Sequence, residues 1–210
     1  MGVIHSKNIL AIGATCCLIT LISGCMAYRT GPIPDVVLLK QDFASASKPT
    51  AHLEVKCQTQ SFNEEVPGKN IAAAQKFKRI IAGVLREPEP FKSYTFTENR
   101  NQQTDLKIVF SFQRVEEGSL VNILLTAGTF TIIPAISSMN YSLTAQIFDS
   151  TGKEVGTYKT EDSMRVWFQI LLLPLGPCRS PDKKEKELVE NLTKNTLLLM
   201  KADGLLNIPQ

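Results

Sequence analysis

Regular alternation of apolar and other residues in three segments constrains the fold of this 210-residue chain more than any other feature. In residues 106–113, apolar side chains occupy every second position, at Leu106, Ile108, Phe110 and Phe112. Residues 52–58 and 141–148 repeat this pattern, residues 149–153 have the composition of a tight turn, and residues 155–160 suit the second arm of that hairpin. A period of two places successive side chains on opposite faces of a strand. The segments therefore predict antiparallel strands with one buried face, two of them joined as a hairpin.

Two segments with helical spacing flank these strands. Residues 70–86 place their apolar side chains three and four positions apart, and Pro88 ends the pattern. A second helix is expected from Ser180-Pro181-Asp182 to Gly204, and residues 52–58 and 93–98 suit further strands. The predicted class is α+β, with an antiparallel sheet of four to five strands and two helices packed on one face.

Two apolar segments interrupt the strand pattern, at residues 120–136 and 166–175. An antiparallel order places both at one end of the sheet, where we expect contact with a membrane or a protein partner. The expected contact residues are Phe130, Ile132, Ile133, Trp167, Phe168 and Leu172. Internal packing of both segments is an open alternative. A third interpretation, a transmembrane helix at 120–136, is disfavoured because the segment is short and contains Gly128 and Pro134.

The N-terminus has the pattern of an export signal. Lys7 precedes an apolar run from Ile9 to Ile22, which is shorter than the ~20 residues of a spanning helix. Small residues follow it, and then Cys25. Residues 21–25, Leu-Ile-Ser-Gly-Cys, resemble the lipobox of bacterial lipoproteins. An ordinary signal peptide with an incidental cysteine, or an uncleaved anchor, remains the alternative.

The lipobox resemblance implies that the signal is removed before Cys25 and that the Cys25 thiol carries a diacylglyceryl group. Met26 stands where the family's inner-membrane retention signal has Asp, which implies the periplasmic face of the outer membrane in a Gram-negative cell. In another cell it implies the extracytoplasmic face of the cell membrane. The expected organisation is a signal peptide at 1–24, a lipidated tether of little order at 25–50, one α+β domain at 51–206 and a tail at 207–210.

Two smaller sets of residues carry hypotheses of their own. In an oxidising compartment, Cys57 and Cys178 could form a disulfide, although Cys57 also suits a buried apolar position. Four basic residues lie opposite the apolar face of the helix at 70–86 and could contact anionic phosphates, or could simply face solvent. They are Lys69, Lys76, Arg79 and Arg86.

The composition offers little material for catalysis or for nucleic-acid binding. Basic residues exceed acidic ones by only 23 to 20, and His52 is the one histidine after the signal segment. No nucleophile elbow, phosphate-binding loop, dinucleotide fingerprint or zinc motif occurs in the sequence. The acidic pair Glu161-Asp162 is expected to be surface charge. We therefore expect no enzyme activity, no cofactor and no metal.

The whole chain resembles proteobacterial outer-membrane lipoproteins through its lipobox. A looser similarity, in element order, is to lipopolysaccharide-assembly lipoproteins and to auxiliary lipoproteins of ABC transporters. The resemblance implies a non-catalytic accessory protein that binds another envelope protein. The alternative is a periplasmic lipid-binding or lipid-transfer protein, with an acyl pocket lined by Ile108, Phe110, Leu143 and Ile147.

Overall fold

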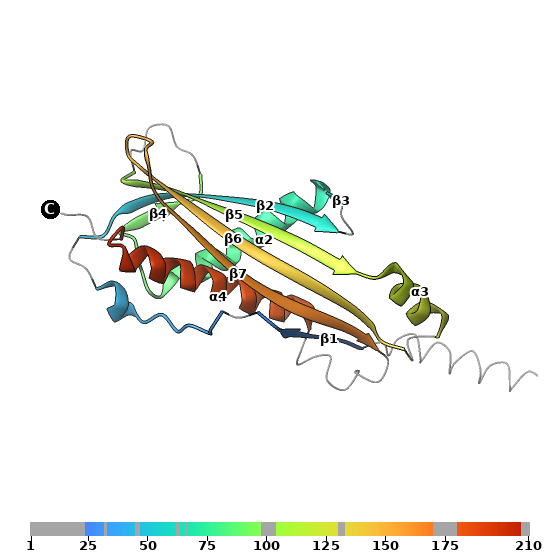
Figure 1. Ribbon diagram of the computed structural model, residues 1–210. Coiled ribbons are helices and arrows are strands. Elements are labelled where there is room, and N and C mark those ends of the chain that lie inside the picture. The colour runs from blue at the N-terminus through green and yellow to red at the C-terminus, as the bar shows by residue number, and fades with distance from the viewer. Residues whose placement is uncertain are drawn as a thin grey trace, which may run out of the picture.

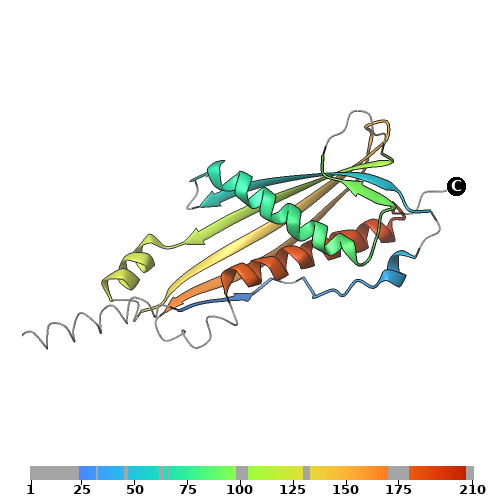
Figure 2. The ribbon, with the colours of Figure 1, turned by 180° about the vertical axis from the view of Figure 1, so that it is seen from behind.

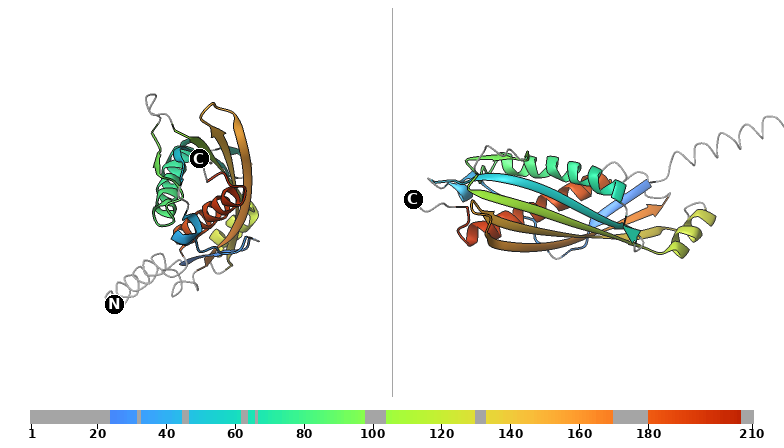
Figure 3. Two further views of the ribbon diagram at one scale, coloured as in Figure 1. Left: turned by 90° about the vertical axis from the view of Figure 1, so that its left-hand side faces the viewer. Right: turned by 90° about the horizontal axis from the view of Figure 1, so that it is seen from above.

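The computed structural model describes residues 24–31, 33–44, 47–61, 64–65, 67–97, 104–129, 133–169 and 180–206. In order, the elements are β1 (Gly24–Arg29), a 3₁₀ helix η1 (Lys40–Phe43), β2 (Thr50–Ser61), β3 (Glu64–Glu65), α2 (Pro67–Arg86), β4 (Ser93–Thr95), β5 (Leu106–Gly118), α3 (Leu120–Gly128), β6 (Ala135–Asp149), β7 (Glu154–Gln169) and α4 (Pro181–Ala202). One curled sheet carries α2 and α4 on its inner face, whereas α3 lies beyond one end of the sheet (Figures 1 and 3).

The α+β class is confirmed, but the predicted sheet was wrong in strand number and direction. The strand order is β1-β7-β6-β5-β2-β3, and β4 pairs beside β2. Strand β2 runs parallel to β4 and to β5, while the other pairs are antiparallel. The reason is that α2, with 20 residues, is long enough to return the chain to the start of β2. The next strands consequently enter in the same direction, as in a βαβ unit.

The hairpin between β6 and β7 is confirmed, and it defines one end of the sheet. Asp149 Oδ1 accepts hydrogen bonds from Thr151 N at 2.8 Å and from Lys153 N at 3.0 Å, and Gly152 has a φ of +83°. A side-chain acceptor and a residue that tolerates positive φ are what a tight turn needs. We name this end the hairpin end. The opposite end, where β7 finishes and α3 lies, is the α3 end. The 15 residues of β6 span about 50 Å between them.

The core lies between the inner face of the sheet and the two helices. Strand positions that alternate toward the helices are fully buried, among them Leu53, Phe110, Leu143 and Ile147. The apolar stripe of α2 meets them, with the Phe77 and Phe112 ring centroids 4.8 Å apart. Helix α4 begins as the sequence predicts, because Ser180 Oγ accepts a hydrogen bond from Lys183 N.

The described residues of 25–50 do not form a loose tether, so that expectation was wrong. Residues 24–29 form the edge strand β1, and the chain then runs along α4 to the hairpin end, where β2 starts (Figure 2). Asn191 of α4 holds this segment by accepting from Val36 N and donating to Pro34 O, both at 2.9 Å. Composition suggested disorder because prolines lack regular backbone pairing. Side chains of α4 and burial of Phe43 supply the missing contacts.

Candidate membrane-facing end of the sheet

Strand register brings four separate parts of the chain to the α3 end. Gly24 at the start of β1 pairs with Gln169 at the end of β7, and Ala135 at the start of β6 pairs with Phe168. Helix α3 joins β5 to β6 at this same end (Figure 1). The predicted sharing of one end by the two apolar segments is confirmed for their described residues. The chain before β2 reaches this end through β1, whereas β2 itself begins at the hairpin end.

The outer face of the sheet, which carries no helix, ends here in an apolar row. Ile136, Trp167 and Met26 are direct cross-strand neighbours on β6, β7 and β1. The preceding row on this face is Ser138, Arg165 and Tyr28, in which Arg165 is exposed. Two residues along a strand cover about 7 Å. The outer face therefore changes from polar to apolar over about that distance.

Trp167 also contacts an aromatic side chain on the neighbouring strand. Its Nε1 donates a hydrogen bond to the Tyr28 hydroxyl at 3.2 Å, and the ring centroids lie 6.5 Å apart. Both side chains are half-buried. Each has an apolar ring and a polar group, the combination that is enriched where protein meets a membrane surface.

Helix α3 continues this apolar surface beyond the sheet. Residues 119–148 contain no Asp, Glu, Lys, Arg or His. Leu124 is 72% exposed and Leu125 is 49% exposed, and Ile133 after the helix is also exposed. Isolated exposed leucines are common on soluble proteins. Here they lie together at one end of the sheet, and such clustering is typical of a contact surface.

The residues expected to make contact are only partly within the described structure. Ile133 and Trp167 lie at the α3 end. For Cys25 and Phe168 the backbone register is described, whereas their side chains are not. Phe130, Ile132 and Leu172 lie outside the described residues. Among the helices of the described residues, none is long and apolar enough to cross a membrane.

On the inner face near this end, a buried ion pair fixes β1 to the sheet. The Asp162 side chain on β7 has no exposed surface, and its Oδ2 accepts from Arg29 Nε at 2.8 Å. Arg29 also pairs with Asp35 and donates to the Ile33 carbonyl at 3.0 Å. One guanidinium group thus joins the end of β1, the following segment and β7. We call this set of contacts the Arg29 clamp.

A second buried carboxylate, Glu185 on α4, joins both helices to the sheet. It accepts hydrogen bonds from the Tyr141 hydroxyl at 2.7 Å and from Arg114 at 3.2 Å, and it pairs with Lys76 on α2. Burial and the adjacent Glu185 carboxylate raise the pKa of Tyr141, so its hydroxyl stays a proton donor. Lys76 also contacts Asp182 at 2.8 Å. These contacts fix the position of α4 relative to α2 and β6.

The basic residues of α2 do not all face an open surface. The ammonium group of Lys76 is held between Glu185 and Asp182. Although partial burial lowers the Lys76 pKa, hydrogen bonds to these two carboxylates raise it overall. Arg79 and Arg86 are exposed, and the side chain of Lys69 lies outside the described residues. Contact of this helix with anionic phosphates remains a prediction. Of its four basic residues, Arg79 and Arg86 are the two that the structure describes as exposed.

Sequence reasoning missed the buried charges, and it wrongly placed Asp162 on the surface. A periodic signal was available for each. Asp162 alternates with buried Met164 and Val166 in β7, Arg114 continues the buried series of β5, and Glu185 precedes Leu188 by one helical turn. A charged residue on an apolar stripe needs a buried partner, because an unpaired buried charge is very costly.

The four residues proposed to line an acyl pocket lie in the core instead. Ile108, Phe110, Leu143 and Ile147 are each fully buried between the sheet and the helices. This packing leaves the lipid-carrier alternative without an open cavity at these residues.

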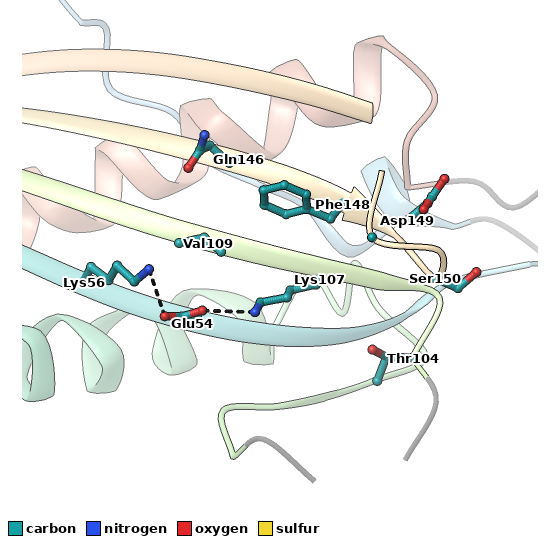
Figure 4. A pocket seen from close by; sticks show the side chains of 10 residues that line it. Glu54, Lys56, Thr104, Lys107, Val109, Gln146, Phe148, Asp149 and Ser150 are labelled. Carbon is teal, nitrogen blue, oxygen red and sulfur yellow. Dashed lines mark ion pairs between the residues drawn. The ribbon is translucent and has the colours of Figure 1, made fainter. Parts of the chain in front are cut away.

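The outer face has an open hollow at the hairpin end (Figure 4). In it, Glu54 pairs with Lys56 at 3.1 Å and with Lys107 at 3.4 Å. Partial burial opposes ionisation of Glu54, but the two lysines hold its pKa below the usual value. Val109 and Phe148 also line the hollow, which thus combines charged and apolar side chains.

The disulfide between Cys57 and Cys178 stays a prediction, because Cys178 lies outside the described residues. Cys57 is half-buried, and its sulfur lies 3.9 Å from the Thr59 hydroxyl. Burial raises the pKa of its thiol. The described residues contain no group of three or more His, Cys, Asp and Glu side chains that could hold a metal ion.

Comparison with known proteins assigns no family. No protein-family model matches this sequence, and no curated protein matches it.

Proposed function

We propose that this chain is a lipid-anchored accessory protein of the cell envelope, which binds an envelope protein and performs no catalysis itself. A diacylglyceryl group on Cys25 would attach it to the periplasmic face of the outer membrane in a Gram-negative cell. The supporting observation is the strand register, in which the backbone of Cys25 lies opposite Phe168, one residue from the apolar row at Met26 and Trp167. Attachment at Cys25 would bring the α3 end against the membrane and direct the hairpin end away from it.

The Arg29 clamp bears on how such an anchor would work. A flexible tether of about 25 residues would let a domain move tens of ångströms from its lipid. Here β1 is paired with β7 from Gly24 to Arg29, and the clamp secures its last residue. The domain would therefore stand at a fixed height and orientation on the membrane. A fixed orientation suits an adaptor that presents one surface to a partner protein.

Two measurements test this function. Mass spectrometry of the mature N-terminus should find a diacylglyceryl cysteine at residue 25, and the Cys25→Ser variant should lack it. Affinity purification of the acylated protein from mild detergent should recover a stoichiometric envelope protein. A mature chain without lipid would contradict the anchor, and recovery of lipid alone would favour the carrier alternative.

A further inference from the structure

We infer that the α3 end itself inserts into the interfacial layer of the bilayer, with Leu124 and Leu125 among the acyl chains and Trp167 and Tyr28 among the headgroups. This inference deepens the proposed function by naming the lipid surface as the partner of this end. It rests on that function for the position of the membrane.

The first argument is the exposed chemistry of α3. Leu124 and Leu125 are substantially exposed on a helix that contains no charged residue. Desolvation of ionised side chains is the main cost of placing protein in lipid. Inserting this helix into the interfacial layer would desolvate none. A nine-residue helix is too short to span a bilayer, but it can lie in the interfacial layer.

The second argument is the order of side chains on the outer face. Moving toward the α3 end, this face passes from Arg165 and Tyr28 to Trp167 and Ile136 within two residues. Water, headgroups and acyl chains follow one another in the same order at a membrane surface. Tyr28 and Trp167 stand at the transition, where amphipathic rings are stable.

The third argument is where the chain enters the structure. Gly24, the first residue of β1, lies at the α3 end opposite Gln169, and the apolar run from Ile9 to Ile22 ends two residues before it in the sequence. Whether this run is replaced by a lipid on Cys25 or retained as an anchor, the membrane attachment joins β1 at this end. Because β1 is paired from its first residue, little free chain separates the attachment from Trp167.

The chain's single tryptophan makes the inference measurable. The acylated protein is reconstituted in phosphatidylcholine vesicles, and Trp167 emission is recorded with lipids brominated near the headgroup or near the chain end. We expect a blue-shifted emission and about two-fold quenching, stronger with bromine near the headgroup. The quenching should persist in high salt, because residues 119–148 carry no charge to be screened.

The double variant Leu124→Asp/Leu125→Asp should lose most of this quenching while it still sediments with the vesicles through its lipid. The matched control is Val155→Asp, because Val155 is also an exposed apolar residue but lies at the hairpin end. It should keep the wild-type signal. Circular dichroism of all three proteins should be the same, since the altered side chains are exposed.

Two outcomes would overturn the inference. If the vesicle-bound, acylated protein shows no quenching of Trp167, the α3 end does not enter the bilayer and would instead be a surface for a protein partner. If the double variant is quenched as strongly as the wild type, α3 has no part in insertion. Failure of the anchor is distinct from both, because mass spectrometry of the vesicle-bound protein would then find no diacylglyceryl group on Cys25, whatever the quenching of Trp167.

Discussion

The two ends of the sheet differ in whether charge is buried on the inner face. Toward the hairpin end, the inner face is built from apolar residues such as Ile108 and Ile147, and charge lies on the outer face, as at Glu54. This is the usual arrangement of a sheet with one face in water.

Toward the α3 end, charge lies on both faces, and exposed Arg165 and Glu117 on the outer face precede its apolar row. Charged groups at Arg114 and Asp162 lie on the inner face beneath the helices, whereas the outer face ends in Ile136 and Trp167. Buried charges are tolerated only with partners, and exposed apolar rows persist where something covers them. Insertion of the α3 end into a membrane, as inferred above, would cover this apolar row.

Breaking the Arg29 clamp should produce the largest effect on stability. Arg29→Ala leaves the Asp162 carboxylate buried without its cation, and we expect the free energy of unfolding to fall by about 3–5 kcal/mol. Urea denaturation measures this loss. Asp35→Ala removes the exposed partner of the same guanidinium and should cost less than about 1 kcal/mol. Equal losses in both variants would mean that burial of Asp162 does not set the strength of the clamp.

The Glu185 cluster should be the next most sensitive site. Tyr141→Phe keeps the buried ring but removes a hydrogen bond to a carboxylate, which should cost about 1.5–3 kcal/mol. The hydroxyl of Tyr158 bonds to Asp203 at the exposed hairpin end, so Tyr158→Phe is the matched control and should cost less than about 1 kcal/mol. If the two variants unfold at the same urea concentration, the inner charges of the α3 end carry no extra stability.

Gly31 tests how tightly the clamp is packed. A Cβ at this position would lie 1.6 Å from Asp162 Oδ1, so Gly31→Ala must displace a fully buried carboxylate. We expect a loss of about 1–3 kcal/mol by thermal or urea unfolding. Gly83→Ala on the exposed side of α2 meets no atom within 4 Å and should instead stabilise by up to about 1 kcal/mol. Destabilisation by both substitutions would argue against close packing as the cause.

The smallest effect concerns pH. The hydrogen bond from Lys76 depresses the pKa of Asp182 in the folded chain, so the pair contributes stability above the unfolded pKa of about 3.9. That contribution is lost as the pH falls through the lower, folded pKa. Because Asp182 is largely exposed, the loss should stay below about 1 kcal/mol. Asp182→Asn should flatten the decline of stability between pH 5 and pH 2, and an unchanged decline would contradict a role for the pair.

The sequence pattern predicted those elements that are defined by residues close together in the chain. The hairpin at 149–153 and the start of α4 at Ser180 follow from turn and cap residues that act on their immediate neighbours. The direction of β2 could not be predicted in this way, because it depends on how far α2 carries the chain. Strand β1 was missed because its pairing partner is distant in sequence and because it spans the predicted cleavage site before Cys25.

The candidate site was predictable only in outline. Uncharged composition marked α3 and the end of β7 as unusual, and alternation placed Trp167 at the correct end of the sheet. The Arg29 clamp was not foreseen, since Arg29 and Asp162 meet only after the sheet has closed.

The pairing of β1 with β7 also sets an order of events during biogenesis. Arg29 and Asp162 are 133 residues apart in the chain, so β1 has no strand to pair with until β7 has been made. Throughout that interval Cys25 would belong to an unfolded, accessible segment. Enzymes that cleave and acylate a lipobox act on such a segment. Late closure of the sheet would therefore give processing time to finish before the N-terminus is sequestered at its edge.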